Sequence, residues 1–153
     1  AMQGLDGGRI NIAACSIGAA QIAFEKSRDY MLERHQFGKP LSEFQALRFK
    51  VADMNTSLVA SRQMVRLAAS RLDNNHPDKT VYCAMAKNFA TEKCFDICDE
   101  ALQIFGGIGY IKEYPLERYL RDSRVHRILE GTSEIMKLII SNRILIKEKS
   151  LII

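Results

Sequence analysis

The chain has 153 residues, 47% of them apolar, and a formal net charge of +4. This length suits one domain with a sizeable core, and the apolar content excludes a disordered chain. The charges are interspersed, no nucleic-acid-binding motif is present and no apolar stretch approaches the ~20 residues that span a membrane, so we expect neither nucleic acid as a partner nor a membrane span.

Five segments carry apolar residues at helical spacing and are predicted to be helices: residues 7–33, 42–73, 79–105, 115–125 and 132–149. Asp6 is the expected N-cap of the first helix. The breaker residues 37–40 and the polar turn 73–78 separate the first three helices, and the glycine-rich stretch 106–109 ends the third one with a left-handed residue.

These segments predict the fold class. No alternating strand pattern and no Asn-Gly hairpin turn appears in the chain. Long helices with one apolar face must pack against neighbours, and short turns make those neighbours antiparallel. In the second helix, the apolar face includes Phe49 and Leu67. We therefore predict an all-α fold, an up-down helical bundle, with residues 1–153 as a single domain.

The cysteines are Cys15, Cys83, Cys94 and Cys98, and three of them stand among Ala, Ile, Met and Phe, where a free thiol packs as a small apolar residue. Cys94 and Cys98 share a helix face, but their spacing is not that of a zinc site and the histidines are scattered. We expect reduced thiols and no bound metal.

Residues 126–134 contain the strongest candidate for chemistry. Glu130 follows Ile128 and Leu129 and precedes Gly131, which lets a ligand approach the backbone closely. Thr132 and Ser133 then have the character of an N-cap for the last helix. A carboxylate beside apolar side chains at a helix start is a candidate general base, whereas the simpler interpretation is an exposed glutamate ahead of a helix cap.

Three other stretches combine turn residues with polar groups. Residues 34–41 place an arginine beside a glycine turn, where it can bind a phosphate or merely offset a helix dipole. Residues 103–110 form a glycine-rich turn whose backbone amides can bind an anion or simply end the helix. Residues 5–9 contain Asp6 and Arg9. These two residues are either functional, or Asp6 is a helix cap and Arg9 a solvated charge.

Together, these stretches resemble the acyl-CoA dehydrogenase family over essentially the whole chain, in the part that is the C-terminal helical domain of its members. The matching motifs are RxxFGxPL at 34–41, QxFGGxGY at 103–110, RD(S/A)R at 121–124 and EGT(S) at 130–133. Within the family, residues 4–11 and 121–126 are most similar to members that act on a short branched, isobutyryl-type acyl-CoA.

The resemblance implies an FAD-dependent α,β-dehydrogenation of an acyl-CoA thioester, with Glu130 removing the α-proton and the flavin taking the β-hydrogen. The backbone N–H of Glu130 and a flavin hydroxyl would stabilise the thioester oxygen. Some members carry the base one position before the arginine that Arg9 matches. Here that position is Gly8, so Glu130 is the one candidate at either family position.

The resemblance also assigns binding residues. Asp6 and Arg9 match contacts to the CoA portion of the substrate, and Gly131 matches a further substrate contact. The cofactor-binding positions, some of which reach the flavin of a neighbouring subunit, are Arg34, Gln36, Phe44, Gln45, Gln103, Ile104, Phe105, Gly106, Gly107, Thr132 and Glu134. Glu134 stands where some members have glutamine, and its charge near phosphates puts its role in question.

Members of the family place an N-terminal helical domain and a middle β-domain before this one, and we expect residues 1–153, which lack both, to be inactive alone. The implied partners are electron-transfer flavoprotein as electron acceptor and further copies of the chain, as a dimer or tetramer. The implied location is the mitochondrial matrix in a eukaryote and otherwise the cytoplasm. An acyl-CoA oxidase-like relative and a non-catalytic helical oligomerisation module are the alternatives.

Overall fold

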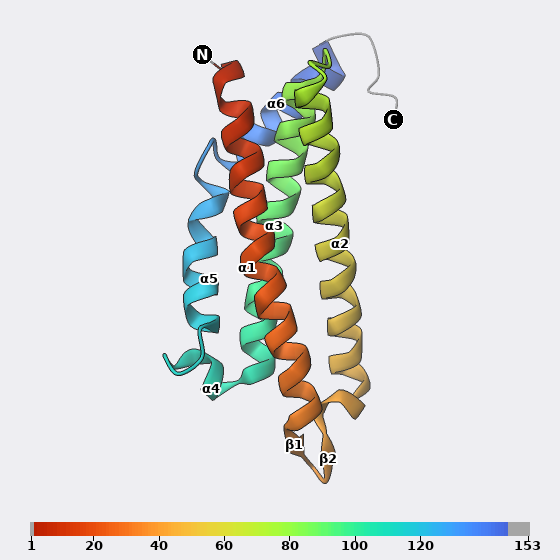
Figure 1. Cartoon of the computed structure of the whole chain (residues 1–153), viewed down its shortest axis with the longest axis vertical. Coiled ribbons are helices and arrows are strands. Elements are labelled where there is room, and N and C mark those ends of the chain that lie inside the picture. The colour runs from red at the N-terminus through yellow and green to blue at the C-terminus, as the bar shows by residue number, and fades with distance from the viewer. Residues whose placement is uncertain (1, 147–153) are drawn as a thin grey trace.

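The computed structural model describes residues 2–146, and three long helices dominate it. α1 (Asp6–Glu33), α2 (Gln45–Asp73) and α3 (Lys79–Phe105) run side by side in alternating directions (Figure 1). The prediction of an all-α, up-down helical bundle is confirmed. The second helix begins later than predicted, because Leu41–Glu43 forms a separate 3-10 turn, η2, and Phe44 has an extended backbone.

Shorter elements precede the long helices, connect α1 to α2 and follow α3. They are η1 (Met2–Leu5), β1 (His35–Gln36), β2 (Lys39–Pro40), α4 (Gly107–Tyr110), α5 (Leu116–Arg124), η3 (Val125–Arg127) and α6 (Ser133–Ile146). The predicted last helix reached residue 149, and residues 147–149 lie outside the described part of the chain.

The expectation of a chain without strands was wrong at one point. β1 and β2 pair antiparallel, with His35 opposite Pro40 and Gln36 opposite Lys39. The two residues between them, Phe37 and Gly38, have φ values of 52° and 81°. Two successive positive φ values are what a tight two-residue hairpin turn requires, and here Phe-Gly provides them in place of Asn-Gly.

α3 is the central helix, because it contacts α1, α2, α5 and α6. Fully buried alanines on α1 and α3 keep side chains small where these two helices pack: Ala13, Ala20, Ala23, Ala86 and Ala90. Cys83, Cys94 and Cys98 are also fully buried, as predicted. Burial raises the pKa of Cys83 and Cys98 to about 11 and that of Cys94 to about 12, so these thiols stay protonated and unreactive at neutral pH.

Part of the predicted buried face is exposed. On α2, Phe49 and Leu67 are 60% and 41% exposed, and on α6 Leu138 and Leu145 are 53% and 81% exposed. Such residues on two helices leave apolar surface uncovered in the single chain. No helix in the described range is long and apolar enough to cross a membrane.

Candidate active site

The candidate base lies on the turn between η3 and α6. Glu130 and Gly131 both have left-handed backbones, with φ values of 57° and 99°. A Cβ on Gly131 would also lie only 2.7 Å from the Cε of Met136, so this position has a second reason to be glycine. A left-handed non-glycine residue is uncommon, and Glu130 persists there because the surrounding helices hold the turn.

The carboxylate of Glu130 lies directly against the backbone of Gly8 on α1. A Cβ built on Gly8 would be 2.5 Å from Cδ and 2.8 Å from Oε1 of Glu130, closer than side-chain atoms come. The absence of a side chain at Gly8 therefore makes room for this carboxylate. Gly8 and Glu130, the two positions at which the resemblance implies a base, thus meet at one point in space.

Asp6 and Arg9 hold this turn from α1. They are 0% and 1% exposed, and the Arg9 guanidinium donates to Asp6 Oδ1 at 2.9 Å. Asp6 Oδ2 also accepts a hydrogen bond from the Thr80 hydroxyl at 2.7 Å. The Arg9 Nε–H reaches the carbonyl oxygen of Glu130 at 3.4 Å. The pair thus connects α1, α3 and the turn.

This geometry corrects one prediction about Asp6. Leu5 occupies the N-cap position of α1, and Asp6 is the first helical residue and makes no cap hydrogen bond. A buried guanidinium requires a carboxylate partner, and this need outweighs capping. Asp6 and Arg9 are buried in this chain, so their predicted contact with the CoA portion of a substrate stays a prediction.

Lys87 on α3 holds the same turn from the other side, and sequence reasoning missed it. The residue is 0% exposed, and Nζ donates to the carbonyl oxygen of Gly131 at 2.7 Å. Burial lowers the pKa of Lys87, the Arg9 charge adds to this shift and Glu92 opposes it. The sequence signal for a buried lysine was its place directly after the apolar run Cys83-Ala84-Met85-Ala86.

Glu92, also on α3, connects the start of α6 to Arg127. The Ser133 hydroxyl donates to Glu92 Oε1 at 2.6 Å, and Arg127 pairs with Glu92 Oε2 at 2.7 Å. The Arg127 guanidinium also lies 4.2 Å from the ring centroid of Phe95. A cleft of about 360 Å³ lies beside this group, and it is lined by Arg124, Thr132, Glu134 and Lys137 among others.

Thr132 and Glu134 occupy the first turn of α6. Thr132 is its N-cap, as predicted, because Oγ1 accepts a hydrogen bond from the backbone N–H of Ile135 at 3.4 Å. Hydrogen bonds from its own backbone N–H and from the Thr132 hydroxyl lower the pKa of Glu134, which is exposed and hence anionic at neutral pH. This charge suits the helix N-terminus and opposes contact with a phosphate.

The other predicted cofactor residues lie on and beside the hairpin. Arg34, Gln36 and Gln45 are exposed, and Phe44 is half-buried, with its ring 6.3 Å from that of Phe37. The guanidinium of Arg34 and the amides of Gln36 and Gln45 thus point to solvent rather than into the bundle. They offer hydrogen-bond donors to a ligand outside the chain.

The stretch 103–107 ends beside the hairpin and splits into two kinds of residue. Gln103, Gly106 and Gly107 are exposed, and Gly106 has the predicted positive φ, 64°, but its ψ of -143° is not that of the left-handed helical conformation. Ile104 and Phe105 are buried, and the Phe105 ring stacks on Tyr30 with centroids 4.1 Å apart. A cofactor contact from this stretch would come from Gln103 and the glycine backbone.

The predicted site residues therefore form two groups. We call Asp6, Arg9, Glu130, Gly131, Thr132 and Glu134 the base end, and Arg34, Gln36, Phe44, Gln45 and residues 103–107 the hairpin end. Figure 1 shows the starts of α1 and α6 at one end of the bundle and the hairpin and α4 at the other. Arg9 and Arg34 are ~37 Å apart at the rise of a continuous helix.

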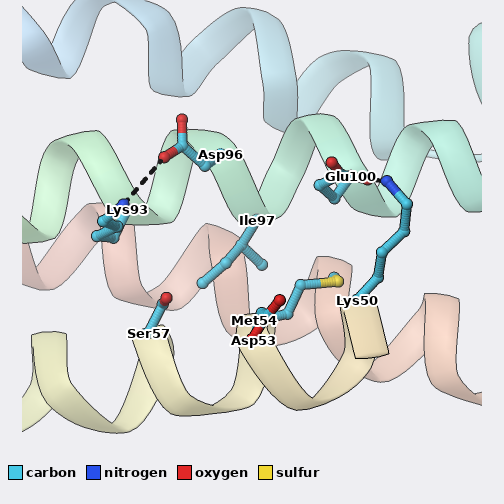
Figure 2. Close-up of a pocket in the computed structure, with 8 residues that line it drawn as sticks. All are labelled: Lys50, Asp53, Met54, Ser57, Lys93, Asp96, Ile97 and Glu100. Carbon is cyan, nitrogen blue, oxygen red and sulfur yellow. Dashed lines mark hydrogen bonds and ion pairs between the residues drawn. The ribbon is translucent and has the colours of Figure 1, made fainter. Parts of the chain in front are cut away.

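A pocket between α2 and α3 is separate from both groups. Figure 2 shows an ion pair between Lys93 and Asp96, 3.7 Å apart, and another between Lys50 and Glu100. The pocket has a volume of about 180 Å³, and its lining includes two lysines and three carboxylates, with each lysine paired to one carboxylate. None of the residues predicted for function lines it.

Known proteins resemble this chain over nearly its whole length. Residues 1–145 match the family described as acyl-CoA dehydrogenase, C-terminal domain. A mitochondrial isobutyryl-CoA dehydrogenase of Dictyostelium discoideum is 57% identical over 94% of this chain and 35% of its own length. A caffeyl-CoA reductase-Etf complex subunit of Acetobacterium woodii is 48% identical over 96% of this chain and 38% of its own.

The fold comparison gives the same result. The structure of butyryl-CoA dehydrogenase from Megasphaera elsdenii superimposes with a TM-score of 0.91 at 42% identity, over 94% of this chain and 37% of that one. The chain thus spans about a third of the length of the relatives it matches.

Proposed function

Since the chain belongs to the acyl-CoA dehydrogenase family, we propose that it is the part of a longer FAD-dependent enzyme that carries the catalytic base. The proposed reaction is the α,β-dehydrogenation of an acyl-CoA thioester. One observation carries the proposal: the Glu130 carboxylate lies on a left-handed turn that two buried cations hold, in a space that Gly8 leaves free.

The residues of the base end account for the proton transfer. The Glu130 carboxylate accepts the proton from the α-carbon of the thioester while the β-hydrogen leaves on the opposite side of the bond. The backbone N–H of Glu130 donates to the thioester oxygen, on which negative charge develops. The fixed turn keeps the carboxylate in one place, which is what a general base requires.

The hairpin end has groups that fit FAD. The exposed guanidinium of Arg34, the amide of Gln36 and the exposed backbone at Gly106 and Gly107 are suitable donors to a diphosphate. When bound, FAD accepts the β-hydrogen as a hydride. At the base end, Thr132 can contact the cofactor through its hydroxyl, whereas the Glu134 carboxylate suits a hydroxyl donor rather than a phosphate.

The distance between the two ends supports a site shared between two copies of the chain. Groups ~37 Å apart along α1 cannot hold the two ends of one binding site around the same reacting atoms. We propose that the hairpin end of one subunit completes the site at the base end of another in a homo-oligomer. The exposed apolar residues of α2 and α6 offer surface for such an assembly.

The substrate and partner proposals rest on the relatives. The similarity to an isobutyryl-CoA dehydrogenase favours isobutyryl-CoA, a short branched thioester, as the substrate. The similarity to a subunit of an Etf complex favours electron-transfer flavoprotein as the electron acceptor. A eukaryotic source would place the protein in the mitochondrial matrix, and a bacterial source in the cytoplasm.

The direct test replaces Glu130 by Gln in the full-length protein and measures turnover of isobutyryl-CoA and butyryl-CoA. Gln keeps the shape and removes the base, so we expect turnover to fall by about 10²–10⁴-fold while FAD stays bound. Glu113→Gln, an exposed glutamate on the turn before α5, is the matched control. Near-normal turnover in the Glu130 variant would place the base elsewhere.

The shared site has its own test, which mixes two impaired full-length proteins at an FAD concentration too low to saturate Arg34→Ala. One carries Glu130→Gln and the other Arg34→Ala, and they are dissociated and reassembled together. In a hybrid dimer one site has both defects and the other has none, so about a quarter of the wild-type activity should return. If no activity returns on mixing, each site is built within one chain.

Two further measurements separate the alternatives. Peroxide release by the full-length enzyme would indicate an oxidase, and reduction of electron-transfer flavoprotein a dehydrogenase.

We also expect the 153-residue chain alone to bind FAD weakly and to be inactive, because the domains that cover the flavin in the family are needed. Robust thioester oxidation by the 153-residue chain would refute this expectation. Light scattering on the same chain tests the simpler role of an oligomerisation module.

A further inference from the structure

We propose that Lys87 is a positioning residue for the base. It fixes the Glu130 carboxylate through a hydrogen bond to the carbonyl oxygen of Gly131, the next residue. The inference rests on the proposed function of Glu130. Lys87 belongs to the central helix α3, is fully buried and donates to Gly131 at 2.7 Å. Lys87 lies outside all of the sequence motifs.

The turn needs such a hold because it has an unfavourable backbone. Glu130 and Gly131 lie between η3 and α6, outside the hydrogen-bond ladder of either element. A left-handed Glu130 costs of the order of 1–3 kcal/mol and persists only where its surroundings fix it. Lys87 from α3 and Arg9 from α1 bind two consecutive carbonyl oxygens of this turn.

The two holds are unequal. The hydrogen bond from Lys87 is 2.7 Å long and that from Arg9 Nε is 3.4 Å, at the limit for such a bond. Arg9 is also tied to Asp6, whereas the ammonium group of Lys87 is directed at the turn. The shorter bond fixes the peptide unit that joins Gly131 to Thr132, so the position of the turn after Glu130 depends chiefly on Lys87.

The chemistry of Lys87 points to a role beyond core packing. A buried ammonium group costs free energy through desolvation, and a methionine of similar volume would fill the same space without that cost. Burial lowers the pKa of this lysine, and Glu92 is the largest of the opposing charges. A lysine buried at such a cost is explained if it holds the turn that carries the base.

The test uses the full-length enzyme with Lys87→Met and, as matched control on the same helix, Lys93→Met, whose exposed side chain faces Asp96. We expect Lys87→Met to be folded and to bind FAD, with a KM for isobutyryl-CoA within about threefold of the wild type. Its kcat should fall by about 10²-fold, the loss that a displacement of ~1 Å can cause. Lys93→Met should match the wild type.

A second readout separates positioning from a general loss of structure. When proton abstraction becomes the slow step, the isotope effect from deuterium at the α-carbon rises, whereas a smaller amount of folded enzyme leaves it unchanged. A normal kcat and isotope effect in Lys87→Met would overturn the inference. If Lys87→Met does not fold, Lys87→Gln, whose amide is too short to reach Gly131, is measured and interpreted in the same way.

Glu130→Gln, measured alongside, separates the two proposals. If it keeps turnover, the proposed base is wrong and the role of Lys87 fails with it. If it abolishes turnover while Lys87→Met leaves kcat and the isotope effect unchanged, the base stands and only the positioning role is refuted.

Discussion

The base end and the hairpin end contain the predicted site residues of the chain, yet they are built in opposite ways. At the base end, Asp6, Arg9 and Lys87 are at most 1% exposed; Arg9 and Lys87 bind one turn, and Asp6 pairs with Arg9. At the hairpin end, Arg34 and Gln36 are exposed, and Phe37 at the tip is 92% exposed. At the base end, the charged groups that fix the turn have their partners within the chain, whereas the hairpin end presents its polar groups to a ligand.

The difference has a physical reason. A base must be fixed before the substrate arrives, and fixing a turn takes buried charges on separate helices. A diphosphate brings its own charge, so its binding residues can stay solvated until it binds. Substitutions at the base end should therefore cost stability or turnover, and those at the hairpin end should cost cofactor affinity.

The largest expected effect is on folding, at Arg9. Arg9→Met leaves the buried Asp6 carboxylate without its cation, which should lower the free energy of unfolding by about 3–5 kcal/mol. Arg34→Met removes an exposed arginine from the other end of α1 and should change stability by less than about 0.5 kcal/mol. Urea unfolding of both variants makes the comparison, and equal losses would show that the two ends are not built differently.

The next effect is on the position of the base. Gly8→Ala introduces a Cβ that would overlap the Glu130 carboxylate, and this displacement should lower kcat of the full-length enzyme by about 10²-fold. Gly7→Ala is the control, because nothing lies within 4 Å of a Cβ at that position. If Gly8→Ala keeps its kcat, the carboxylate reacts from another place than the one described.

A smaller effect is expected at the hairpin end, on cofactor binding alone. Arg34→Ala should weaken FAD binding by the full-length protein by about 1.5–3 kcal/mol, the contribution of hydrogen bonds to a charged group. Arg28→Ala, an exposed arginine on the same helix that pairs with Asp29, should leave it unchanged. Titration calorimetry with FAD gives both values. Equal affinities would remove Arg34 from the cofactor site.

The smallest effect concerns pH and again the base end. His126 accepts or donates a hydrogen bond with the Ser16 hydroxyl at 2.8 Å, and burial lowers its pKa from 6.5. His126 therefore binds a proton more readily in the unfolded chain than in the folded one. The stability that neutral, buried His126 contributes is complete above pH 6.5 and is lost as the pH falls. His126→Asn should flatten the decline in Tm below pH 6.5, and His35→Asn at the exposed hairpin should not.

The sequence predicted the bundle well because helical periodicity over residues 7–33 and 79–105 is long and strong. It missed the hairpin, since Phe37 takes a positive φ that its residue type rarely adopts. It also misjudged Phe49 and Leu67, because periodicity identifies an apolar face and says nothing of whether the single chain covers it.

At the site, the local sequence and the motifs predict Glu130 as the base, which stays a prediction, and the structure shows that Gly8 lies against its carboxylate. Asp6 was misread as a helix cap, because its partners Arg9 and Thr80 become evident only when α1 and α3 pack. Lys87 was missed for a related reason. A buried lysine and its carbonyl acceptor are 44 residues apart, and no local pattern links them.

The length of α1 has a consequence for how the enzyme behaves in solution. Because one helix separates the two ends by ~37 Å, every complete site of the proposed kind needs two chains. Specific activity should then depend on protein concentration and decline on dilution below the dissociation constant of the assembly, even though each subunit remains folded.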